Sequence, residues 1–70
     1  MLLKKRSFSL AGHRTSVALE DAFWGVIEAE AKEKGQSLAA FVQRIDATRG
    51  ARPLASAMRL AALAAVGKRP

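Results

Sequence analysis

The sequence predicts a small, mainly helical domain that begins with a short β ribbon and is completed by a second copy of the chain. Three observations lead to this fold class. Polar and apolar residues alternate from Arg14 to Leu19, as they do in a strand. Two amphipathic helical patterns follow, separated at Lys34–Ser37. Half of the 70 residues are hydrophobic, a large share for a chain of this size, which alone buries only roughly 60% of its unfolded surface.

An alternating segment precedes this strand. Its apolar residues, Phe8 and Leu10, are even-numbered, whereas the apolar residues of the following strand are odd-numbered. One continuous strand would therefore put the two sets on opposite faces. Gly12 lies between the segments and permits a turn or a bulge. Two outcomes stay open: residues 6–10 fold back as a hairpin strand, or they form a basic arm that orders only on a ligand.

The strand from Arg14 to Leu19 needs a partner, because a lone strand leaves its backbone hydrogen-bonding groups unsatisfied. The simplest source of that partner is a second copy of the chain. In such a ribbon Thr15, Val17 and Leu19 face the core.

The first helix is expected to begin near Glu20 and to end at Gly35, which suits the position just past a helix end. Gly25 weakens its interior by about 1 kcal/mol relative to alanine, and the missing side chain suggests a close approach by a neighbouring backbone. Ser37 is the expected N-cap of the second helix, and Gly50 closes that helix.

A third helix is expected from Pro53 or Leu54 to Val66, with proline suited to a helix start. Ser56 and Arg59 are its only polar residues. A helix that is apolar nearly all round must be largely buried, and in so short a chain we expect it to be buried against the dimer or against further copies. A membrane-surface helix is the alternative, although its polar face is thin.

Size, charge and composition exclude several classes of protein. There is no cysteine, and the single histidine, His13, cannot build a zinc site unaided. No nucleophile–base pair, carboxylate pocket or phosphate loop is present, so neither an enzyme nor a cofactor or small-molecule substrate is expected. Twelve basic residues against six acidic ones give a net charge of +6, which suits an anionic polymer. The short apolar start does not continue as a signal peptide or a membrane span, so we expect a bacterial cytoplasmic protein.

The chain resembles the ribbon-helix-helix domain family. The strand ends at Leu19, Gly35-Gln36-Ser37 opens the second helix, and the apolar helical positions match those that the family buries. The string from His13 to Trp24 is similar to a group of short bacterial members that have the same Lys-Arg-Ser-Phe type of start and a third helix. The resemblance covers nearly the whole chain. It divides the chain into residues 1–12 as a basic arm or extra strand, residues 13–50 as the ribbon-helix-helix core, and residues 51–70 as the C-terminal helix and basic tail.

The resemblance implies a homodimer that binds double-stranded DNA and regulates transcription. The paired strands would enter the major groove with Arg14, Ser16 and Ala18 facing the bases. Only Arg14 has the long polar side chain typical of the family's readers. The start of the second helix would hold a phosphate, although Ser37 also serves simply as an N-cap. The expected phosphate contacts are Lys4, Lys5, Arg6, Gln36, Ser37 and Leu38. For the first three, a disordered solubilising charge is the alternative. The expected dimer core is Val17, Leu19, Phe23, Trp24, Ile27, Leu38, Phe41, Val42 and Ile45.

Alternative interpretations remain open. The same fold serves as an oligomerisation or protein-interaction module that does not read DNA, with tetramers formed through the C-terminal helix. An antitoxin is a third function, for which a toxin-wrapping tail is expected and not found. The side chain of His13 either contacts DNA or lies in solvent beside a turn. Trp24 is expected in the core, where its indole N–H needs a partner.

Overall fold

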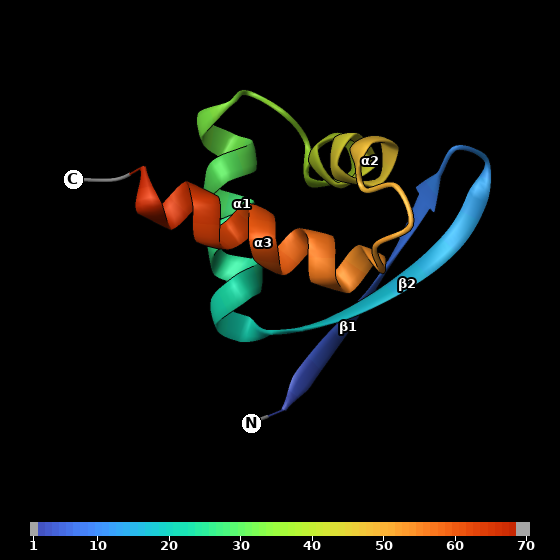
Figure 1. The fold of residues 1–70 in the computed structure, drawn as a ribbon, viewed down its shortest axis with the longest axis horizontal. Coiled ribbons are helices and arrows are strands. Elements are labelled where there is room, and N and C mark those ends of the chain that lie inside the picture. Colours follow the sequence, from blue (N-terminus) through green and yellow to red (C-terminus); the bar gives the residue numbers. More distant parts are fainter. Residues whose placement is uncertain (1, 69–70) are drawn as a thin grey trace.

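A computed structural model describes residues 2–68 as two strands followed by three helices (Figure 1). Met1 and the Arg69–Pro70 end of the predicted basic tail lie outside the described residues. The elements are β1 (Leu3–Leu10), β2 (His13–Glu20), α1 (Asp21–Glu33), α2 (Leu38–Thr48) and α3 (Leu54–Gly67).

Strands β1 and β2 form an antiparallel hairpin, with register partners running from Leu3 and Glu20 to Leu10 and His13. The two turn residues, Ala11 and Gly12, have positive φ angles of 50° and 82°, as in the tight turns that match strand twist. The chain itself therefore supplies the strand that β2 needs. The prediction that a second copy supplies it was wrong, and the alternative of a hairpin strand is confirmed.

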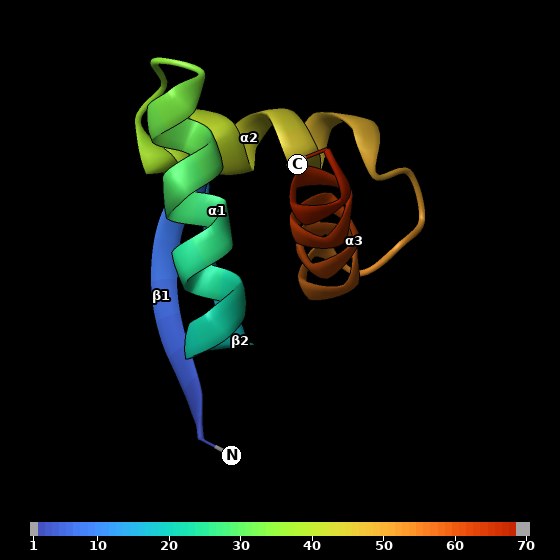
Figure 2. The ribbon, with the colours of Figure 1, turned by 90° about the vertical axis from the view of Figure 1, so that its left-hand side faces the viewer.

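The hairpin removes the mismatch between even and odd apolar positions. In this register each even-numbered residue of β1 faces an odd-numbered residue of β2, so Phe8 and Leu10 share one face with Val17 and Leu19. All four are buried. Helices α1, α2 and α3 cover the face of the hairpin that carries these four side chains. In a view along the axis of α3, this helix lies beside α1 (Figure 2).

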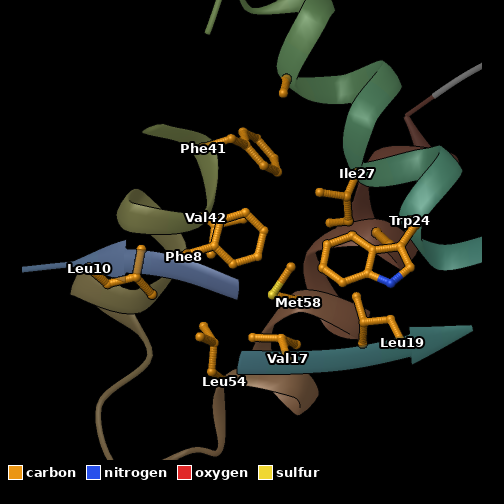
Figure 3. Packing of buried hydrophobic residues seen from close by; sticks show 12 residues of the cluster. Phe8, Leu10, Val17, Leu19, Trp24, Ile27, Phe41, Val42, Leu54 and Met58 are labelled. Atoms are coloured by element: carbon orange, nitrogen blue, oxygen red, sulfur yellow. The ribbon is translucent and has the colours of Figure 1, made fainter. Parts of the chain in front are cut away.

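The core is built within one chain (Figure 3). Of the side chains predicted for the dimer core, six are buried: Val17, Leu19, Trp24, Ile27, Phe41 and Val42. Three are half-buried and pack against these: Phe23, Leu38 and Ile45. Phe8 and Leu10 of β1 and Leu54 and Met58 of α3 cover the same cluster. The nine residues predicted for the dimer core thus pack within the single chain, and their part in a dimer stays a prediction.

Helix α3 is buried along one side only. Leu54, Met58 and Ala62 are buried against the rest of the chain, chiefly α1 and α2. Part of α3 is therefore buried within its own chain, and burial of the rest against a second copy stays a prediction. Its other side exposes an apolar stripe, which we call the α3 stripe: Leu60, Leu63 and Val66, with exposed fractions of 45%, 59% and 50%.

The helix ends follow the predicted signals. Gly35 and Gly50 both have positive φ, 68° and 61°, just past α1 and α2, a conformation that glycine adopts without strain. The Ser37 hydroxyl accepts a 3.1 Å hydrogen bond from the Ala40 amide and caps α2. The close approach of a neighbouring backbone that was expected at Gly25 is not found, because a Cβ at this position would meet nothing within 4 Å.

Candidate nucleic-acid interface

The face of the hairpin directed away from the helices is the candidate interface. We call it the outer face. Alternation along the strands assigns to it Leu3, Lys5, Ser7 and Ser9 of β1 and Arg14, Ser16, Ala18 and Glu20 of β2. The Ser7 and Ser16 hydroxyl oxygens are 3.0 Å apart, with either able to donate, which confirms that these two residues share one face.

The three predicted base-facing residues lie together on the outer face. Arg14 and Ser16 are exposed and Ala18 is half-buried. Ser9 of β1 is the register partner of Arg14. Among the described residues, no carboxylate lies within 4 Å of the Arg14 guanidinium. The side chain that is best suited to reading guanine is therefore not held by an ion pair.

The three basic residues predicted to contact phosphate separate onto two faces. Lys4 lies toward α1, where its Nζ is 3.4 Å from Asp21 Oδ1. Arg6 also lies toward α1, with Nη1 3.1 Å from Glu28 Oε2 and its guanidinium carbon 4.7 Å from the centre of the Trp24 ring. Lys5 alone belongs to the outer face. Sequence reasoning treated the three as one patch and missed the β1 residues of this face, although alternation from a turn at Gly12 is the signal that places them.

The start of α2 offers fewer free groups than predicted. The Gln36 amide donates to the Ala31 carbonyl at 2.9 Å and so belongs to the end of α1, while Gln36 Oε1 is buried without a hydrogen-bond partner in the described part of the chain. The Ser37 hydroxyl is used as the cap. The first backbone amides of a helix cannot reach an intrahelical carbonyl, so the amide of Leu38 is the group here that an anion can use.

These features occur in a chain whose residues 3–66 match the family model described as ribbon-helix-helix domain. The chain belongs to the ribbon-helix-helix family. The match covers both strands and all three helices except for the last residue of α3. The family commonly binds DNA. No curated protein and no solved structure matches the chain.

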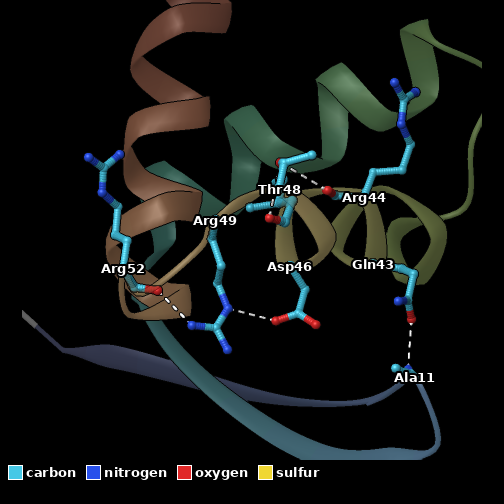
Figure 4. A network of polar contacts seen from close by, with 8 residues as sticks. Ala11, Gln43, Arg44, Asp46, Thr48, Arg49 and Arg52 are labelled. Carbon is cyan, nitrogen blue, oxygen red and sulfur yellow. Dashed lines mark hydrogen bonds and ion pairs between the residues drawn. The ribbon is translucent and has the colours of Figure 1, made fainter.

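One hydrogen bond joins the tip of the ribbon to α2 in this ribbon-helix-helix chain, and further polar contacts lie at the end of α2 (Figure 4). The Ala11 amide in the turn donates to Gln43 Oε1 of α2 at 3.0 Å. Farther along, Arg49 Nε donates to Asp46 Oδ1 at 2.7 Å, and Arg49 Nη1 donates to the Arg52 carbonyl at 2.6 Å. The outer face is thus presented by a turn that is hydrogen-bonded to a helix.

The other end of the ribbon is held by two contacts. The Trp24 indole N–H donates to the Lys4 carbonyl at 2.8 Å, which is the partner that this buried side chain was predicted to need. Arg59 of α3 donates from Nη2 and Nε to Glu20 Oε1 at 2.9 and 3.1 Å. A backbone hydrogen bond at Glu20 and then the Arg59 hydrogen bond lower the Glu20 pKa below its usual value. The one carboxylate of the outer face is therefore kept ionised and bound by its own cation.

The remaining predicted features have simple positions. His13 is exposed beside the turn, at the first residue of β2, so both of its interpretations stay predictions. Among the described residues, no helix has the length and hydrophobicity that crossing a bilayer requires.

Proposed function

We propose that this ribbon-helix-helix chain binds double-stranded DNA through the outer face and acts as a cytoplasmic, homodimeric regulator of transcription in a bacterium. The observation that carries the proposal is the composition of that face in a chain of this family. Between Leu3 and Glu20 it bears cationic and hydroxyl side chains on a two-stranded ribbon, and its only carboxylate is bound by Arg59.

The ribbon has the shape for the proposed contact, since the major groove, about 12 Å wide, admits a two-stranded β ribbon. In this arrangement Arg14 donates to O6 and N7 of a guanine, Ser16 exchanges hydrogen bonds with a neighbouring base, and Ala18 offers a methyl contact to thymine. Arg14 supplies most of the selectivity, because the other two side chains are short.

Phosphate contacts orient the ribbon in the proposed complex. Lys4 and Arg6 lie on the opposite side of β1, toward α1, where the Lys4–Asp21 pair is exposed and the Arg6–Glu28 pair is partly exposed. Exposed pairs of this kind contribute only about 0–1 kcal/mol, so a DNA phosphate can compete for either cation. At the start of α2, beside Gln36 and Ser37, the backbone N–H of Leu38 and the helix dipole hold a second phosphate.

The proposed homodimer rests on the α3 stripe rather than on strand pairing. Monomeric soluble proteins rarely expose contiguous large apolar side chains without a partner. Leu60, Leu63 and Val66 recur on one side of α3 and carry no charge. Pairing of this stripe between two chains leaves both outer faces available for DNA.

The test is DNA binding at several salt concentrations, with duplexes selected from a random library. Affinity should fall steeply with salt, with a logarithmic slope of about −0.9 for each phosphate neutralised. Arg14→Ala should weaken binding to the selected duplex by roughly tenfold or more and reduce the preference for guanine at one position. Arg44→Ala is the matched control, because Arg44 is an exposed cation of α2 directed away from the hairpin (Figure 4). Absence of binding at low salt would overturn the proposal.

A second candidate function is a protein-interaction or assembly module without DNA recognition. The α3 stripe favours it, as does the shortness of Ser16 and Ala18 on the outer face. In that case Arg14→Ala would leave every measured association unchanged, whereas changes in the α3 stripe would abolish assembly.

A further inference from the structure

We propose that Lys5 of β1 is a base-contacting, specificity-determining residue, so that a single chain carries both strands of the reading surface. This inference rests on the proposed DNA binding by the outer face. It reassigns Lys5 from the phosphate contacts expected from the sequence.

The position of Lys5 is set by its neighbours in the strand. Lys4 lies toward α1, within 3.4 Å of Asp21, and Arg6 lies toward α1 on the Trp24 ring. Successive side chains of a strand point to opposite faces. Lys5 therefore projects from the outer face, the same face as the Ser7–Ser16 contact.

The surroundings leave the Lys5 ammonium free to reach a ligand. Its register partner is Ala18, which is too short to cover it. Among the described carboxylates, none lies within 4 Å of Lys5 Nζ. The nearest carboxylate along the adjoining strand on this face, that of Glu20, accepts two hydrogen bonds from Arg59.

The spacing gives Lys5 and Arg14 different base pairs to read. The register partner of Arg14 is Ser9, so four strand residues separate Lys5 from Arg14 along the ribbon. At about 3.3 Å per residue this is roughly 13 Å, or about four steps of 3.4 Å along the DNA. Lysine, like arginine, donates to guanine O6 and N7 in the major groove. The outer face thus has a cation toward each end and a hydroxyl pair, Ser7 and Ser16, between them.

The experiment compares Lys5→Ala with Lys4→Ala on duplexes in which each base pair of the selected site is changed in turn. The two variants remove the same charge from adjacent positions of one strand, but only Lys5 belongs to the outer face. Lys5→Ala should reduce the preference for one base pair, about four steps from the pair read by Arg14, from roughly tenfold to near none. Lys4→Ala should keep every preference. Lys5→Arg should retain a preference for guanine at that position. This result would show that the loss in Lys5→Ala does not come from a defect in folding.

Two other results are distinguishable. If Lys5→Ala weakens all duplexes equally and lowers the salt slope by about one unit, Lys5 is a phosphate contact and this inference fails, while DNA binding by the outer face stands. If the unmodified protein binds no duplex at low salt, the proposed function fails, and the assignment of Lys5 fails with it.

Discussion

At the scale of single residues, Ala11 carries a backbone conformation that its side chain does not favour. It is the one non-glycine residue in the described part of the chain with a positive φ, 50°. The left-handed region costs an ordinary L-residue roughly 1–2 kcal/mol, whereas asparagine followed by glycine is preferred in such turns. The Ala11 side chain is exposed, so the only contact to preserve is the amide hydrogen bond to Gln43.

We therefore expect Ala11→Asn to raise the free energy of unfolding by about 1 kcal/mol. Urea denaturation followed by circular dichroism measures this change. Ala51→Asn is the control, because Ala51 is also exposed but has no positive φ, and it should be close to neutral. A loss of stability in Ala11→Asn would show that the turn differs from the one described.

The residue scale also shows what the sequence could predict of the candidate site. Alternation was sufficient to group Arg14, Ser16 and Ala18 on one face of the ribbon. Alternation could not divide Lys4, Lys5 and Arg6, because their segment was open to two interpretations, a strand or a basic arm. Only a strand directs successive side chains to opposite faces. Once β1 is a strand, alternation divides its three cations, and two of them meet carboxylates of α1 that are distant in sequence.

At the scale of elements, the sequence contained both strands but did not decide how they pair. The first turn position is alanine rather than asparagine or aspartate, so the strongest hairpin signal was absent. Helix α3 was located correctly, yet its buried side could not be predicted. Alanines occur on both of its sides, so the hydrophobic pattern gave no direction, and the packing against α1 and α2 decided it.

The ion pair between the end of β2 and α3 should make stability depend on pH. Because the folded pKa of Glu20 lies below its ordinary value of 4.5, the pair stabilises the fold at pH values above 4.5, and this stabilisation is lost as the pH falls through the folded pKa. We expect Glu20→Gln to lower the thermal midpoint at neutral pH and to flatten its decline in acid.

Thermal unfolding between neutral pH and pH 2 measures both effects. Arg59→Gln should flatten the acid decline in part, because it removes the side chain that donates to Glu20 but leaves the backbone hydrogen bond, which is the larger cause of the lowered Glu20 pKa. If both variants retain the full acid decline, the pair between β2 and α3 does not contribute to stability.

At the scale of the whole molecule, most of the acidic side chains form ion pairs with basic side chains of the same chain. Five ion pairs in the described chain join five of the six acidic residues to basic ones. None of the described carboxylates lies within 4 Å of the Lys5 or Arg14 side-chain nitrogens, and both residues belong to the outer face. The net charge of +6 was visible in the sequence, but its distribution over the surface depended on which strands and helices meet.

The assembly of the molecule can be tested at the α3 stripe. Leu60→Glu combined with Leu63→Glu should convert the proposed homodimer to a monomer, because the stripe would then oppose like charges at an apolar contact. The fold should survive, since both side chains are largely exposed in the single chain. Sedimentation equilibrium measures the mass, and circular dichroism checks the fold.

The matched control for this variant is Ala22→Glu combined with Ala29→Glu, which adds the same charge at exposed positions of α1. It should leave the mass unchanged. A monomeric mass for the unmodified protein, or a dimeric mass for the double leucine variant, would contradict the proposed dimer contact.

The hairpin between β1 and β2 has a consequence for the response to protein abundance. Where a ribbon needs one strand from each of two chains, dilution dismantles the reading surface, and occupancy of DNA falls with the square of the free chain at low concentration. Here both strands belong to one chain, so dilution separates complete reading units. Under the proposed function, a cell that holds few copies of this protein would occupy isolated DNA sites in direct proportion to the number of chains.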